Sequence, residues 1–132
     1  MAGALAVLYE KPTRFARYTV ADGTSIPKYT LLKLTTPNTA IATGADNDPV
    51  AGIAMFEKVA SDGSTEITAA LDGVWGLTCS AAGITVGNDV TINGANEIKI
   101  YTTLDNEKGY VLGKTLQTTA GGEVIKVRLN VL

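Results

Sequence analysis

Histidine is absent from this chain of 132 residues, which limits the chemistry that its side chains can perform. The sequence therefore lacks the usual general base, the commonest metal ligand and every Ser-His or Cys-His nucleophile. An enzyme of this composition would depend on carboxylates or lysine. One such alternative is a trimeric β-fold enzyme, for example a nucleotide hydrolase, which a buried cluster of Asp72, Asp89 and Asp105 would support. The lack of a recognisable catalytic set favours a protein that is not an enzyme.

Two short motifs resemble ligand-binding loops without meeting their requirements. Asp46-Asn47-Asp48 lacks the glycine and the distal glutamate of an EF-hand calcium loop, so the segment is interpreted as a turn. Gly109-Tyr110-Val111-Leu112-Gly113-Lys114-Thr115 has three residues between its glycines. A phosphate-binding loop has four and is followed by a helix. We therefore predict no metal site and no cofactor.

Two further side chains have reactive or recognition potential. Trp75 stands between Gly73 and Gly76 and is expected in the core; an exposed Trp75 would instead be an interface anchor. Cys79 lies in an apolar run with no neighbouring cation to lower its pKa, so we expect a buried, inert thiol. A single cysteine forms no internal disulfide.

Composition excludes several classes of function. With 45% hydrophobic and 18% charged residues, the chain is typical of one globular domain. Its formal net charge of -2 argues against a nucleic-acid binder that neutralises phosphates. No apolar run approaches the roughly 18 residues needed to cross a bilayer, and the apolar start lacks the basic segment of a signal peptide. We expect a soluble protein, made in the cytoplasm, whose partners are protein surfaces.

Turn signals recur roughly every ten residues and predict an all-β fold, a small sandwich or barrel. The runs between them alternate, as in Ile98-Lys99-Ile100-Tyr101-Thr102, so that one face is buried. Asn93-Gly94 is the strongest hairpin signal, because both residues tolerate positive φ. At most one short helix is expected, between Ala51 and Ala60.

A short pattern recurs along the chain. Residues 26–34 align with residues 84–92, and Val50-Ala51-Gly52 aligns with Val111-Leu112-Gly113. A glycine turn and another alternating stretch follow in each case. We expect a single β domain over residues 22–132, with duplicated halves at 22–78 and 79–132 as an interpretation of this repeat.

Residues 1–21 differ from the rest and are interpreted as an extended N-terminal arm. Such an apolar and basic terminus either pairs as an additional strand or docks on a partner. In the docking interpretation, apolar side chains are buried at the contact and cations steer association with acidic groups. The candidate arm residues are Leu5, Val7, Leu8, Tyr9, Lys11, Arg14, Phe15, Arg17 and Tyr18.

Several segments together resemble the capsid decoration, or cement, proteins of tailed phages. They are residues 23–34, then Pro49-Val50-Ala51-Gly52-Ile53-Ala54, which matches that family's "pVaGia" segment, and Leu71-Asp72-Gly73-Val74-Trp75, which matches its "Gv" strand. The C-terminal part of that family's sequences is similar to residues 111–115 and 122–129.

The resemblance implies a homotrimer on the outer surface of the icosahedral head of a bacteriophage. There it would bind neighbouring major capsid subunits and stabilise their contacts, with the N-terminal arm providing much of the binding. No nucleic acid or membrane is implied as a partner. The alternative is another structural or adhesion module of a virion or cell surface.

Overall fold

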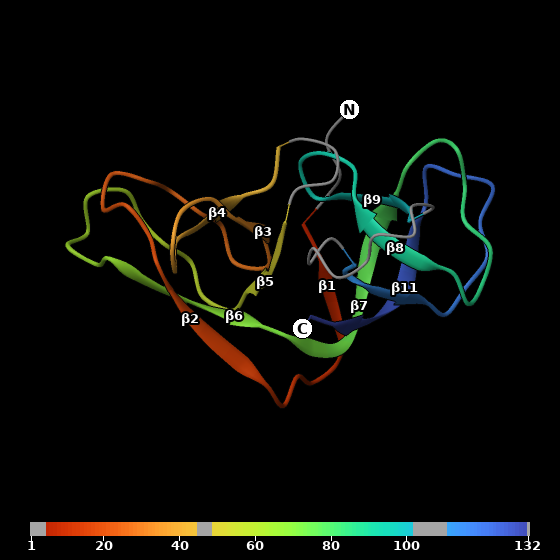
Figure 1. Cartoon of the computed structure of the whole chain (residues 1–132), viewed down its shortest axis with the longest axis horizontal. Coiled ribbons are helices and arrows are strands. Elements are labelled where there is room, and N and C mark those ends of the chain that lie inside the picture. Colours follow the sequence, from red (N-terminus) through yellow and green to blue (C-terminus); the bar gives the residue numbers. More distant parts are fainter. Residues whose placement is uncertain (1–4, 45–48, 102–110, 132) are drawn as a thin grey trace.

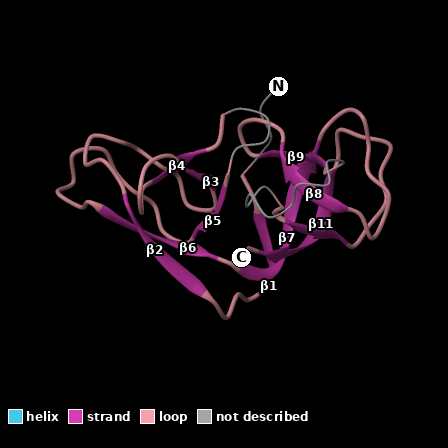
Figure 2. Cartoon of the chain, in the orientation of Figure 1, coloured by secondary structure: helices cyan, strands magenta, loops and turns pink. Residues whose placement is uncertain are grey.

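The computed structural model describes residues 5–44, 49–101 and 111–131, which form eleven β-strands and no helix (Figures 1 and 2). The all-β prediction is therefore confirmed. The short helix allowed between Ala51 and Ala60 does not form, because Val50–Ala54 is strand β5, whose five residues are all buried. Side chains on both faces of β5 are covered, which suits the small and β-branched residues of this segment.

The first sheet has five strands in the order β2-β6-β5-β3-β4. All neighbouring pairs are antiparallel. A single parallel bridge between Thr19 and Thr39 brings the ends of β2 and β4 together. The strands in chain order are β2 (Phe15–Thr19), β3 (Leu31–Leu34), β4 (Ala40–Ala42), β5 (Val50–Ala54) and β6 (Glu66–Ala70).

The second sheet is a closed five-stranded barrel in the order β7-β11-β10-β8-β9, because β9 pairs in parallel with β7. Strand β1 (Val7–Glu10) lies outside the barrel and pairs antiparallel with β7. In Figure 1 the first sheet lies on the left and the barrel on the right. The barrel strands are β7 (Asp72–Cys79), β8 (Asp89–Ile92), β9 (Glu97–Ile100), β10 (Gly113–Thr115) and β11 (Val124–Asn130).

The two sheets share one connectivity. Numbering each set of five strands from its own start, both have the spatial order first, fifth, fourth, second, third. The predicted repeat aligns Gly52 with Gly113, and these glycines lie opposite Leu32 and Val90, which are also aligned with each other. The boundary between the sheets differs from the predicted one. Strand β2, expected in the arm, belongs to the first sheet, and β7, expected in the first half, belongs to the barrel.

Two hydrophobic clusters hold the sheets together. The smaller lies within the first sheet and includes Val20, Ile26 and Leu32. The larger fills the barrel and extends to Leu31 and Ile53 of the first sheet. The two halves therefore share apolar contacts.

The hairpin predicted at Asn93-Gly94 connects β8 and β9, which pair antiparallel. The positive φ angles are at Gly94 (108°) and Asn96 (55°), so the loop is longer than a two-residue turn. The Asn93 N–H donates to the Glu97 carbonyl at 2.8 Å and closes the loop. In the part of the chain that the structure describes, no helix is long and apolar enough to cross a membrane.

Candidate interaction surface

The predicted arm runs through both sheets. Residues 7–10 form β1 on the barrel and residues 15–19 form β2 in the first sheet. Ala6, just before β1, is buried, and its N–H donates to the Tyr29 carbonyl at 3.1 Å. These residues thus pair as strands, and their binding to a partner stays a prediction that depends on which side chains face outward.

The outer patch consists of Val7, Tyr9, Gly76, Val124 and Lys126, on the exposed face of β1, β7 and β11. Val7, Tyr9 and Val124 are 46%, 51% and 48% exposed. A Cβ placed on Gly76 would lie 2.8 Å from a Tyr9 ring carbon and 3.1 Å from a Val124 methyl group, so these side chains meet over the glycine. The Lys126 ammonium lies 4.8 Å from the centre of the Tyr9 ring. The patch therefore combines contiguous apolar surface with a cation.

Val124 and Lys126 belong to this surface but are not among the candidate residues predicted from the sequence. The signal was present, because β11 alternates exposed and buried residues from Val124 to Asn130. An apolar residue at an outward position of such a strand is a recognition candidate.

Other arm residues face inward or stand apart from the outer patch. Leu8 packs against the barrel core. Tyr18 packs against the first-sheet core and its hydroxyl donates to the Ala51 carbonyl at 2.9 Å. Burial raises the pKa of Tyr18 above its ordinary value. Leu5 is 43% exposed ahead of β1, and Phe15 is 51% exposed on β2. Leu8 and Tyr18 thus serve packing within the chain.

The three cations of the arm have different surroundings. Arg14 is bound within the chain: one of its terminal nitrogens donates to Asn130 Oδ1 at 3.0 Å and to the Val131 carbonyl at 3.2 Å. Arg17 lies 3.7 Å from Glu66 in an exposed ion pair, and Lys11 is exposed. Lys11 and Arg17 are therefore the more accessible cations for a partner.

Asp72 binds the segment that connects β1 and β2. Its carboxylate accepts hydrogen bonds from the Thr13 hydroxyl at 2.7 Å and from the backbone N–H groups of Thr13 and Arg14. Burial acts to raise the pKa of Asp72, but these hydrogen bonds and the Arg14 charge outweigh it and lower the pKa. Asp72 is therefore an ionised structural anchor.

Two hollows of about 340 Å³ each meet at Arg128 and Asn130. One borders Asp72 and the other borders the exposed Asp89, while Asp105 lies outside the described residues. Asp72 and Asp89 do not form the buried pair that the enzyme alternative requires. Within residues 5–44, 49–101 and 111–131 no group of acidic or cysteine side chains is arranged to hold a metal ion. The residues Asp46-Asn47-Asp48, Gly109 and Tyr110 also lie outside the described part.

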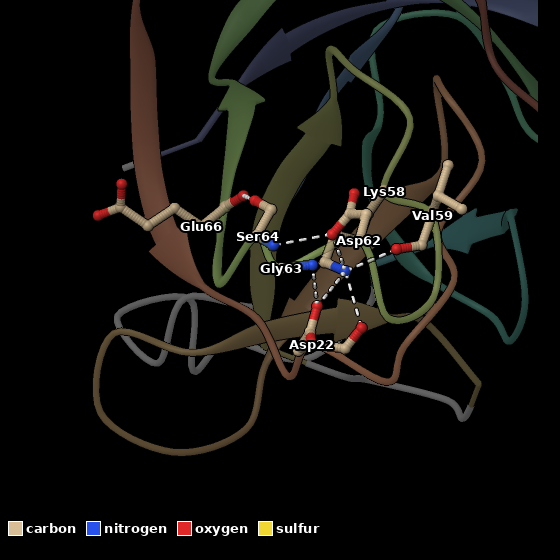
Figure 3. Close-up of polar contacts among 7 residues, drawn as sticks. All are labelled: Asp22, Lys58, Val59, Asp62, Gly63, Ser64 and Glu66. Carbon is tan, nitrogen blue, oxygen red and sulfur yellow. Dashed lines mark hydrogen bonds and ion pairs between the residues drawn. The ribbon is translucent and has the colours of Figure 1, made fainter.

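Lys58 forms a buried polar cluster under the turns of the first sheet (Figure 3). Its side chain is 2% exposed, and its ammonium donates to Asp62 at 2.8 Å and to the carbonyls of Asp22 and Val59 at 2.8 Å each. Burial acts to lower the pKa of Lys58, but the hydrogen bonds and charges of Asp62 and Asp22 raise it overall. Because its hydrogen-bond acceptors come from Asp22 in one loop and from Val59 and Asp62 in another, this buried cation joins the two loops.

Trp75 is fully buried, and its indole N–H donates to the Asp72 carbonyl at 3.0 Å. Its ring meets Tyr29 edge-on, with centres 5.3 Å apart. Its expected place in the core is thus observed, and the alternative role as an interface anchor is wrong, because no part of the ring is exposed. Cys79 is buried too, and burial raises the pKa of its thiol.

Comparison with known proteins gives a match in fold. No family model matches the chain, and no curated protein matches it in sequence. Among solved structures, the chain is similar to the N base of the head fiber gp8.5 of bacteriophage phi29, with a TM-score of 0.55 and 15% identity. The similarity covers 90% of this chain and 98% of that one. At this identity the likeness shows a shared fold, in which both sheets take part.

Proposed function

We propose that this protein is a structural component of a bacteriophage head, bound to the outer surface of the capsid. The observation that carries the proposal is the extent of the match, which spans almost all of the phi29 head fiber base and most of this chain. The resemblance of several segments to tailed-phage decoration proteins supports the same class. The proposed partner is the major capsid protein, and the proposed action is to stabilise contacts between neighbouring capsid subunits.

The outer patch is the proposed contact surface. Tyr9 and the two valines would lose water-exposed apolar area on binding, and Lys126 would meet an acidic group of the capsid. As a trimer, the protein would present three such patches, so that modest single contacts act together. The action is mechanical and needs no bond-making chemistry.

Binding to heads tests the proposal. Purified protein is mixed with expanded, empty heads of the phage that encodes it and pelleted, and its mass in solution is measured by light scattering. We expect a trimer that pellets with the heads. A protein that stays in the supernatant at all concentrations would contradict the proposal.

Point variants are preferable to deleting the arm, because deletion would remove β1 and β2 from the two sheets. Val124→Ser lies in the outer patch, and Val86→Ser is its matched control, since Val86 is 54% exposed elsewhere. We expect V124S to weaken pelleting and V86S to leave it unchanged. Equal binding by both variants would exclude the outer patch as the contact surface.

A second candidate is the base of a head fiber, which the likeness to the phi29 fiber base favours. Electron microscopy of the heads separates the two. Compact density repeated at three-fold and quasi-three-fold points fits a decoration protein, whereas density at the foot of a projecting fibre fits a base.

A further inference from the structure

Strand β2 has one paired edge and one open edge. Along one side it pairs with β6 from Phe15 to Thr19. On the other side, among the described residues, only Thr19 is paired, through the bridge to Thr39 and a 2.6 Å hydrogen bond to the Asn38 carbonyl. We call the side of Phe15 to Tyr18 that faces away from β6 the open edge.

The backbone groups that point to the open edge follow from the ladder. The Arg14 carbonyl accepts from Leu71, and the Val20 N–H donates to Thr65, so both of these residues bond toward β6. In an antiparallel pair such bonds alternate along the strand. Phe15 and Arg17 therefore direct their N–H and C=O groups to the open edge, which is a template for another strand.

The barrel shows what occupies the equivalent position. Thr78 bridges Glu97 in parallel just as Thr19 bridges Thr39, so β7 corresponds to β2. Counting back from these threonines, Val74 corresponds to Phe15 and Gly76 to Arg17. Val74 and Gly76 are the residues that face Glu10 and Val7 of β1. The two sheets share a topology, yet among the described residues only the barrel has this sixth strand.

We propose that the open edge of β2 binds an extended strand of a partner protein, in the way that the edge of β7 binds β1. Such β-strand addition takes its affinity from main-chain hydrogen bonds and its specificity from alternate side chains. The choice of partner rests on the proposed function: the extended strand is a segment of the major capsid protein.

Side chains beside the open edge define the strand that fits. In the barrel, Leu8 of β1 packs inward beside the fully buried Trp75 of β7. The residue of β2 that corresponds to Trp75 is the smaller Ala16. Both Ala16 and Tyr18 are half-buried. An incoming large apolar side chain would cover both. On the outer face, Phe15 and Arg17 favour an apolar and an acidic residue.

Strand β2 of a second copy of this chain is a poorer occupant. Pairing β2 with its own copy about a two-fold axis would bring Arg17 and Arg14 of both copies to one small area, and like charges across strands destabilise pairing. It would also give closed pairs instead of the proposed trimer.

A peptide with the sequence of residues 5–11, capped at both ends, is the probe, because this strand already fills the equivalent position on β7. Amide hydrogen exchange of the full-length protein is measured by NMR with and without excess peptide. We expect exchange at Phe15 and Arg17 to slow by about tenfold or more, and the amides of Ala16 and Tyr18, which bond toward β6, to change less.

Arg17→Pro and Arg17→Ala form a matched pair. Both remove the guanidinium, but only proline removes the N–H that points to the open edge, where no hydrogen bond of the first sheet is lost. We expect R17A to bind the peptide and R17P to lose binding. If R17P fails to fold, the exchange measurement on the unmodified protein still decides.

Unchanged exchange at Phe15 and Arg17 in saturating peptide would overturn the proposal, as would peptide binding only at residues 73–76. Slow exchange without peptide that disappears on dilution would overturn the assignment to a partner and indicate a second copy.

Pelleting with heads separates this inference from the proposed function. Heads that retain R17A and release R17P support a capsid strand. Heads that retain both variants exclude the open edge from capsid binding while the proposed function stands. If even the unmodified protein fails to pellet, the proposed function fails, and the peptide result still decides the edge.

Discussion

The Asp72 carboxylate accepts two hydrogen bonds from Thr13, one from its backbone N–H at 2.6 Å and one from its hydroxyl at 2.7 Å. Asp72 begins β7, and Thr13 lies between β1 and β2. This contact therefore ties the segment that crosses between the two sheets to the first strand of the barrel.

Replacing Asp72 with alanine is expected to lower the free energy of unfolding by about 2 kcal/mol, because the donors of Thr13 and Arg14 lose a charged acceptor. Urea denaturation measures the change, with Asp89→Asn as the control on an exposed carboxylate.

The lowered pKa of Asp72 also sets a pH dependence of the stability. Its stabilisation is complete above the ordinary aspartate pKa and is lost as the pH falls through the lowered value. D72N should therefore lose less stability on acidification than the unmodified protein; equal losses would contradict this role.

Lys58→Met is expected to lower the melting temperature, because Asp22, Asp62 and two backbone carbonyls lose their common donor. Lys114→Met is the control on an exposed lysine. Since the pKa of Lys58 is raised, its contribution is complete below the ordinary lysine pKa and disappears only as the pH rises through the raised value. Thermal melts up to strongly alkaline pH measure this. A melting temperature for K58M equal to that of K114M would exclude a structural role for the cluster.

Gly113→Ala is expected to destabilise the barrel by about 1–3 kcal/mol. A Cβ at this position would clash with the Arg128 carbonyl oxygen on the neighbouring strand, where the backbone cannot easily move. Gly23→Ala is the control, because a Cβ there meets no atom within 4 Å, and its effect should stay within about 0.5 kcal/mol. Chemical denaturation of both variants measures the difference.

The fluorescence of Trp75 is expected to report the core directly, because it is the only tryptophan of the chain. Its complete burial predicts a blue-shifted emission that moves to longer wavelength on unfolding. Binding to heads should leave the emission of the folded protein unchanged. Quenching of the native protein by acrylamide at the rate of a free indole would contradict the buried position.

Cys79 is expected to resist thiol reagents in the folded protein, because it is buried and its pKa is raised by that burial. Labelling of the Cys79 thiol with a chromogenic disulfide reagent should proceed only as denaturant unfolds the chain. Rapid labelling at neutral pH without denaturant would show that β7 opens locally.

The strand content was predictable because its signals are local. Alternation from Val124 to Asn130 indicates a strand with one buried face, which the structure shows. The hairpin at Asn93-Gly94 follows from residues that tolerate positive φ, as Gly94 does. The alignment of Gly52 with Gly113 could also be predicted from the sequence, because each glycine lies in a similar apolar segment.

Pairing between distant segments was not predictable in the same way. Nothing near Phe15 indicates that it lies opposite Ala70, so local pattern alone places β2 in an arm instead of a sheet. Lys58 looks like a surface lysine, since its burial depends on an aspartate from another loop. The outer patch required knowing that β1 and β11 both border Gly76.

The position of β1 beside β7 has a consequence for the order of folding. As the chain leaves the ribosome, the first sheet has all its strands once Ala70 has emerged. The earlier residues Val7 and Tyr9 must wait for Gly76 before they have a partner strand. Such distant pairing slows folding and leaves an apolar segment exposed meanwhile. Although Val7 and Tyr9 precede both sheets in the sequence, they are therefore among the later residues to find their native contacts, and nascent chains that stall before β7 would leave them exposed and prone to aggregate.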